Sequence, residues 1–132
     1  MSKSFTTELK IQSSTLFPQA ATVTTNVTQV VSGSAGFDIL VVSQSSTRNL
    51  YISTEADVSN TVYFYAQALS TNPQTLLLAI TGSNTSGSST VRLRPGDWTY
   101  IPVNVDAAGV AVNCINASTS SANIYAFYAQ RG

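Results

Sequence analysis

The chain has no histidine and very little charge. Six basic and six acidic residues occur among 132, so 9% of positions are charged and the net charge is zero, whereas globular domains usually carry about 25%. Such a chain lacks the basic surface that binding to nucleic acid or to an anionic membrane requires. Without imidazole, the metal sites and catalytic triads that depend on it are excluded. We therefore expect neither a nucleic-acid nor a membrane partner.

Cysteine is nearly absent as well. Cys114 is the only one, so no disulfide can form within the chain. Its place in the apolar stretch Val110–Ile115 predicts a buried thiol that behaves as a small hydrophobe. No run approaches the roughly 20 apolar residues of a membrane-spanning helix, and the start of the sequence lacks the basic-then-apolar order of a secretion signal. These features favour synthesis in a reducing cytoplasm.

Apolar residues make up 43% of positions and recur in short alternating runs, separated by glycine, proline, asparagine and serine. Strands are expected at 20–31, 37–43, 50–54, 61–69, 75–80, 90–94, 98–103, 109–116 and 123–130. This pattern predicts an all-β fold, an antiparallel β-sandwich of eight to nine strands with jelly-roll-like connections. We expect a single domain over residues 1–132, with residues 1–18 as an N-terminal arm or first strand.

Glycine and proline mark the expected turns. Arg94–Asp97 has proline and then glycine at its two central positions, as a type II turn requires, and we expect it to form a tight hairpin. Gly33–Gly36 predicts a turn between two strands. Pro102 lies late in its strand, which predicts a sheet edge or a strand end. The polar segment 80–89 predicts an exposed loop.

Two of the expected strands are apolar on both faces. In 61–67, Val62 and Phe64 face one side while Tyr63 and Tyr65 face the other, and 123–130 repeats the pattern. A sheet face that meets water in a monomer is normally polar. Because few charges keep copies apart, we expect other copies or a partner to cover some of this surface. The alternative is an outer sheet whose tyrosine hydroxyls face water.

Residues suited to catalysis are few. Glu55 and Asp57 lie two apart and could hold a calcium ion weakly, but a solvated turn explains them better. Asp38 lies between two apolar residues on an expected strand, where pairing with an arginine is the ordinary interpretation. The spacing of the acidic residues is compatible with a two-carboxylate hydrolase, but no sequence feature supports one. We expect no enzyme activity, no metal and no cofactor.

Two pairs of side chains could serve an interface. Arg92 and Arg94 share one face of a strand, where they either bind carboxylates of a neighbouring subunit or keep a solvated edge from aggregating. Trp98 and Tyr100 repeat this spacing. Paired aromatic rings can stack on sugars, but they belong more often to a core or an interface.

The last third of the chain resembles a known group of proteins. The residues that carry the resemblance are the segment Val91–Val103 with its Pro-Gly-Asp-Trp turn, the small-residue hairpin Ala107–Gly109 and the closing strand Ile124–Tyr128. Together they resemble small structural proteins encoded in the head and tail modules of tailed bacteriophages. The resemblance implies a β-sandwich that decorates or cements a capsid, commonly as a trimer, with an N-terminal arm that grips the shell.

We therefore expect a virion structural protein, a capsid decoration (cement) protein that is made in the host cytoplasm and lies on the particle surface. Its expected partners are the major capsid protein and further copies of itself, with a trimer favoured. Shell contacts are expected from the arm residues Phe5, Leu16 and Phe17. Subunit contacts are expected from Tyr63, Tyr65, Trp98, Tyr100 and Tyr125, with Arg92 and Arg94 as polar anchors. The alternatives are a receptor- or glycan-binding module of a tail fibre or spike, and a collar or tail component.

Overall fold

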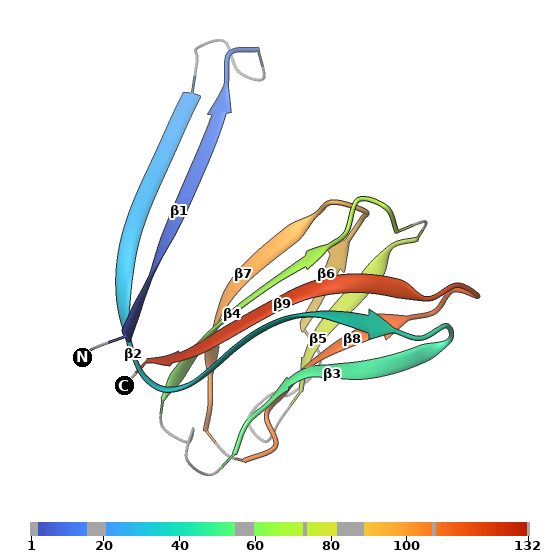
Figure 1. Ribbon diagram of the computed structural model, residues 1–132. Helices are drawn as coiled ribbons and strands as arrows, with labels where there is room; N and C mark the ends of the chain where they lie inside the picture. Colours follow the sequence, from blue (N-terminus) through green and yellow to red (C-terminus); the bar gives the residue numbers. More distant parts are fainter. Residues whose placement is uncertain are drawn as a thin grey trace.

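The computed structural model describes residues 3–15, 21–54, 60–72, 74–81, 89–106 and 108–131. Over these residues the chain contains β-strands and no helix. The nine strands are β1 (Lys3–Ser13), β2 (Ala21–Val42), β3 (Ser46–Ile52), β4 (Thr61–Ala68), β5 (Leu76–Thr81), β6 (Ser89–Leu93), β7 (Trp98–Asn104), β8 (Ala111–Asn116) and β9 (Ala122–Arg131). Figure 1 shows a two-layered body from which β1 and the start of β2 project.

The strands form two sheets, and all of the pairs are antiparallel. One sheet has the order β1-β2-β9-β4-β7 and the other β3-β8-β5-β6. From β2 onward, every connection except β5–β6 crosses from one sheet to the other, which is the connectivity of a jelly roll. The predicted antiparallel β-sandwich is thus confirmed, and Pro102 lies on the edge strand β7 as predicted.

The core lies between the two sheets and follows from alternation along the strands. Phe64 and Ile124 from one sheet and Leu78 from the other are fully buried. Cys114 is buried among them, as predicted, and desolvation raises the pKa of its thiol to about 12. The inward faces are therefore mainly apolar, with Asn116 as a buried polar side chain at one end of β8.

The strand β2 is longer than predicted. It runs from Ala21 to Val42 without interruption, so the turn predicted at Gly33–Gly36 is wrong. The register instead shifts between Val31 and Ala35, where β2 stops pairing with β1 and begins to pair with β9. A Cβ atom at Gly36 would lie 2.6 Å from the Cε1 atom of the Tyr128 ring. Glycine is needed here for close packing within a strand.

The turn at Arg94–Asp97 has the predicted shape but another role. Gly96 has φ +90° and the Asp97 N–H donates to the Arg94 carbonyl over 2.9 Å, as in a type II turn. However, β6 and β7 belong to different sheets, so the predicted tight hairpin is wrong. Type II turns splay the strands that they join. The turn pairs instead with the backbone of Ala68 at the end of β4.

Asn116 joins three segments at one end of the sandwich. Its side-chain amide donates to the Val42 carbonyl over 3.0 Å and to the Ser120 carbonyl over 2.8 Å. Its Oδ1 atom accepts from the Ser118 N–H over 3.1 Å. The side chain is buried, and its bond to the buried Val42 satisfies a backbone carbonyl inside the fold.

Replacing Asn116 should destabilise the fold far more than replacing its neighbour on the opposite face of β8. Asn116→Ala removes the bonds to Val42 and Ser120 and is expected to lower the free energy of unfolding by about 1–3 kcal/mol. Asn113→Ala is the matched control, because its amide makes one long bond of 3.4 Å to Thr81. Urea unfolding measures both, and equal losses would contradict this role for Asn116.

The Cys114 thiol should be inert in the folded chain. At pH 8, thiol reagents are expected to label it only after unfolding, since the protonated, buried thiol is a poor nucleophile. Above about pH 9 the unfolded chain releases this proton while the folded chain holds it, so the free energy of unfolding should fall as pH rises toward 12. Cys114→Ala should show a smaller fall. Stoichiometric labelling of the native chain would contradict the prediction.

Candidate functional site

The outward face of the larger sheet is the main candidate surface. The pairing registers of β2, β9, β4 and β7 place residues of this face in three adjacent rows. The rows are Ala35, Ala129, Tyr63 and Pro102; then Phe37, Phe127, Tyr65 and Tyr100; then Ile39, Tyr125, Gln67 and Trp98. We call these twelve residues the aromatic face. They include no charged side chain, which is unusual for a sheet face turned away from the core.

Ring contacts connect neighbouring strands across the aromatic face. The Phe37 and Tyr125 rings are stacked at 6.0 Å. The Tyr65 and Trp98 rings lie 6.3 Å apart in a tilted arrangement. Phe37 is nevertheless 66% exposed and Trp98 50% exposed. Contacts within the face therefore leave large apolar side chains in water at both of its edges.

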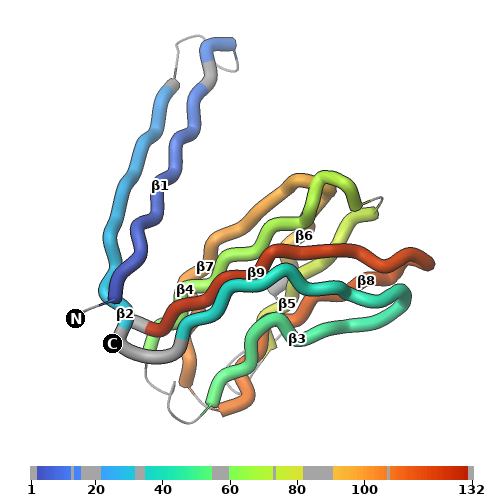
Figure 2. The backbone as a smooth tube through the Cα atoms, viewed as in Figure 1, coloured from blue at the N-terminus to red at the C-terminus, as the bar shows by residue number. Residues whose placement is uncertain are grey.

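The arm consists of β1 and residues 21–31 of β2, which form a two-stranded ribbon (Figure 2). Because residues paired in register share a face, one side of the ribbon is mainly apolar. This apolar arm face comprises Phe5, Thr7, Leu9, Ile11, Val23, Thr25, Val27, Gln29 and Val31, with Lys3 opposite Val31 at its base. The opposite side is polar, with a Thr6–Thr28 hydroxyl bond of 2.9 Å and an Asn26 amide that donates to Glu8 over 3.0 Å.

The base of the arm is attached to the aromatic face by Phe5. Its ring meets the Tyr63 ring at 5.7 Å and the Phe127 ring at 5.3 Å, both nearly edge-on. Tyr63 is consequently 7% exposed although it lies on an outward face. The arm thus covers the middle of the aromatic face and leaves Phe37 and Trp98 uncovered.

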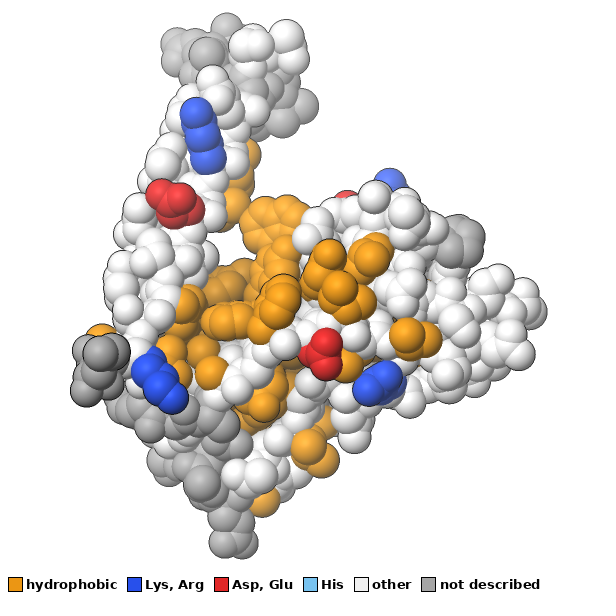
Figure 3. All heavy atoms as spheres, viewed as in Figure 1, with side chains coloured by type: hydrophobic (Ala, Val, Ile, Leu, Met, Phe, Trp, Pro, Cys, Tyr) orange, Lys and Arg blue, Asp and Glu red, His pale blue; other side chains and the backbone are white. Residues whose placement is uncertain are grey.

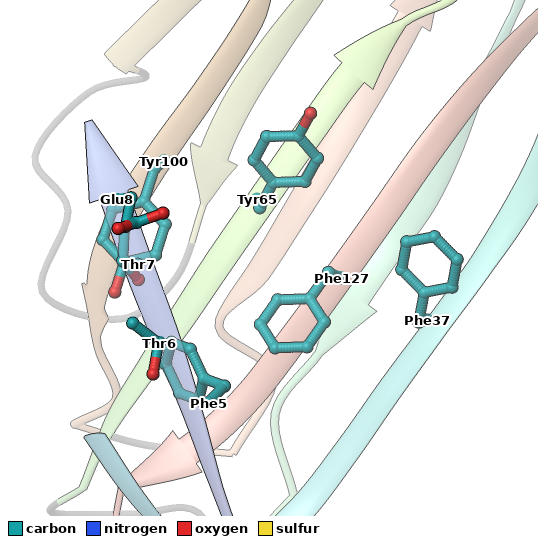
Figure 4. A pocket seen from close by; sticks show the side chains of 8 residues that line it. All are labelled: Phe5, Thr6, Thr7, Glu8, Phe37, Tyr65, Tyr100 and Phe127. Atoms are coloured by element: carbon teal, nitrogen blue, oxygen red, sulfur yellow. The ribbon is translucent and has the colours of Figure 1, made fainter. Parts of the chain in front are cut away.

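Two hollows lie between the arm and the aromatic face. The first, of about 340 Å³, is lined by Phe5, Phe37, Tyr65, Tyr100 and Phe127 among others, and Figure 4 shows these rings on neighbouring strands. The second, of about 360 Å³, lies beneath Leu9 and Val27 of the arm and is walled by Tyr63, Trp98 and Pro102. Apolar side chains gather in this region in Figure 3. Together the hollows form a largely apolar groove, with Glu8 of β1 lining both.

The structure brings most of the predicted interface residues together. Tyr63, Tyr65, Trp98, Tyr100 and Tyr125 all belong to the aromatic face, and Phe5 packs on it. Arg92 and Arg94 do not join this group. Both are exposed, on and just after the edge strand β6 of the other sheet.

Some residues of the surface were missed by the sequence analysis, and some predicted residues cannot be placed. Phe37, Ile39 and Phe127 were missed, although alternation along their strands put them opposite core residues. Leu16, Phe17, Glu55 and Asp57 lie outside the described residues. Asp38 was expected to pair with an arginine; its carboxylate accepts a hydrogen bond from the Ile39 N–H over 2.7 Å.

The aromatic face can bury apolar groups of a partner and can form hydrogen bonds through uncharged side chains. Burial raises the pKa of Tyr65, and the neighbouring Tyr125 raises it further, so this phenol stays neutral at physiological pH. The Tyr65 hydroxyl donates to Gln67 Oε1 over 2.9 Å. Among the described residues, no cluster of three or more potential metal-ligating side chains occurs. No helix in the described part of the chain could cross a membrane.

Comparison with known proteins assigns no family. No family model matches the chain, and no curated protein matches it. Among solved structures, the crystal structure of Peruvianin-I, a cysteine peptidase from Thevetia peruviana latex, is similar at a TM-score of 0.48 and 17% identity. The match covers 74% of this chain and 52% of that one, so the chain spans about half of its length. A likeness of this degree says nothing about activity.

Removing the Phe5 ring should loosen the arm while leaving the sandwich intact. An isolated two-stranded ribbon is marginal in water, and each aromatic pair contributes about 0.5–1.5 kcal/mol beyond its buried area. In Phe5→Ala, amide hydrogen exchange is expected to accelerate over 3–13 and 21–31 but not over 111–116. Thr6→Ala, on the polar side of the ribbon, is the control. Unchanged exchange in Phe5→Ala would contradict the anchoring role of Phe5.

Proposed function

We propose that the chain is a virion structural protein, a decoration (cement) protein that acts as a homo-oligomer on the head of a tailed bacteriophage. The observation that carries the proposal is the uncovered apolar surface of the aromatic face and the arm. Large exposed apolar patches mark surfaces that bind other proteins. The resemblance of the last third of the chain to phage head and tail proteins supports the choice of a capsid.

In this proposal the protein stabilises an assembled shell by mass action. A protein that binds the assembled shell better than the free subunits shifts the equilibrium toward the shell. Its partner is the major capsid protein, and several copies in one oligomer would bind with avidity. Leu16 and Phe17, which follow β1 in the sequence, remain the predicted shell contacts. Phe5 is less suited to that role, because its ring is already half-buried against its own sheet.

Contacts between copies are assigned to the aromatic face. Aromatic residues contribute most of the binding energy in many interfaces, and the five predicted rings lie together there. Arg92 and Arg94 project from the other sheet, so they would act as anchors at a separate contact or as protection of the β6 edge.

A second candidate function is glycan binding by a tail fibre or spike module. The observation in its favour is the second hollow, where the exposed Trp98 and Tyr100 lie with Gln29 and Thr25. An aromatic wall with a few polar groups is a usual feature of small-ligand sites. In that case the uncovered rings would stack on sugars and would not meet other copies.

Light scattering followed by head binding tests the proposal. The purified chain is expected to have three times its 13.9 kDa mass, to co-sediment with empty heads to saturation, and to raise the temperature at which they disassemble. The variant Leu16→Ser, Phe17→Ser should keep its oligomeric mass and lose head binding. Thr47→Ala, an exposed position on β3 of the other sheet, is the control for a remote surface change.

Two other results would replace the proposal. Specific saccharide binding on a glycan array, without affinity for heads, would establish the second candidate. Labelled protein found at a single tail vertex would indicate a collar or tail component.

A further inference from the structure

We infer that the uncovered part of the aromatic face is covered by the arm of a second copy of this chain. Each arm would rest at its base on its own sheet and extend with its far half over the sheet of the next copy. This inference depends on the homo-oligomer of the proposed function but not on the phage shell.

The apolar arm face is longer than the chain's own sheet can cover. Near the base, Phe5 and Leu9 are half-buried against the sandwich. Farther out, Ile11 is 58% exposed and its cross-strand neighbour Val23 is 57% exposed. A ribbon of two strands has no core of its own and needs a partner surface to be stable. Among the described residues, the far half of the arm therefore has no apolar surface that covers it.

The arm cannot fold back to cover its own sheet without breaking its anchor. Ile11 is six residues from Phe5, or roughly 20 Å along the strand at about 3.4 Å per residue. Phe37 lines the same hollow as Phe5, at the base of the arm. A straight arm therefore holds Ile11 far from Phe37. Figure 1 shows the arm extending away from the sandwich. Another copy is thus required to supply an apolar β-ribbon to Phe37.

The chemistry of the proposed contact is already present within one chain. Phe5, from the apolar arm face, packs edge-on against Tyr63 and Phe127 of the aromatic face. Phe37 is the register partner of Phe127 and is exposed. Aliphatic side chains from the far half of an arm can pack on this row as Phe5 does. The two surfaces are therefore complementary in kind.

Charge favours a second copy over other partners. The aromatic face has no charged side chain, and the apolar arm face has none between Phe5 and Ile11. Glu8 and Lys10 lie on the opposite, polar side of the ribbon. The residues Ile11, Val23 and Phe37 of the contact carry no charge, while Glu8 lines the two hollows and accepts a hydrogen bond from Asn26. The zero net charge of the chain raises no barrier between copies. Lys3 lies opposite Val31 at the base of the arm, so an anionic partner would find no basic side chain between Phe5 and Ile11 of this face.

The contact would be heterologous, because each chain presents one arm and one different receiving surface. Head-to-tail contacts close into a ring when the rotation between copies allows it. A ring of three would agree with the predicted trimer. The arm and the aromatic face would then be the two halves of a single repeated interface.

Mixing two defective variants tests the inference. The arm variant, Ile11→Asn with Val23→Asn, keeps its aromatic face, and the face variant, Phe37→Ser with Ile39→Ser, keeps its arm. Each alone is expected to be a monomer by light scattering. An equimolar mixture is expected to form a complex of twice the chain mass, since one intact arm meets one intact face. The control Lys10→Asn with Thr24→Asn alters the polar side of the same ribbon and should keep the wild-type mass.

Folding is checked in each variant by the protection of the Cys114 thiol, and the milder Ile11→Thr with Val23→Thr replaces an arm variant that fails. A mixture that remains monomeric would overturn the inference, because an intact arm would then fail to bind an intact face. Either variant keeping the wild-type mass by itself would also overturn it, because arms would then pair with arms or faces with faces. A monomeric wild-type chain would overturn it too, together with the homo-oligomer. Successful complementation without binding to heads would support the inference and remove only the decoration role.

Discussion

The structure depends on the sharing of one long strand between two partners. The first part of β2 pairs with β1 and the second part with β9, with a register shift between Val31 and Ala35. Because the strand does not end there, the ribbon is joined to the sandwich by continuous β backbone. A turn at this point would have left the two strands of the arm without a fixed direction. The continuity of β2 sets Phe5 over Tyr63 and Phe127, and so creates the groove.

The aromatic face follows from the registers of four strands. The alternation that sends Phe64 and Ile124 into the core turns Tyr65 and Phe127 outward on the same strands. Strands that are apolar on both sides contribute to two surfaces. One is the sandwich core and the other is the aromatic face. The second surface is covered at its middle by Phe5 and is open at Phe37 and Trp98. This unequal coverage underlies both the proposed assembly and the proposed exchange of arms.

Much of the fold could be predicted because alternation and turn residues are local signals. Strand positions, the edge location of Pro102 and the buried Cys114 were recovered in this way. Gly33–Gly36 was interpreted wrongly, since the glycine requirement at Gly36 comes from the distant Tyr128 ring. The shape of the Arg94–Asp97 turn is local and could be recognised from the sequence. Whether the turn makes a hairpin depends on whether β6 and β7 lie in the same sheet, and they do not.

The sequence by itself determined which residue types alternate along each strand, and therefore that two apolar faces exist. It also determined that few charged side chains were available to these faces, because only 9% of positions are charged and histidine is absent. Only the tertiary structure decided which strands lie side by side, because pairing registers join residues far apart in the chain. That is why Phe37 was missed although it lies beside Phe127, and why Arg92 is separated from rings with which it was expected to act.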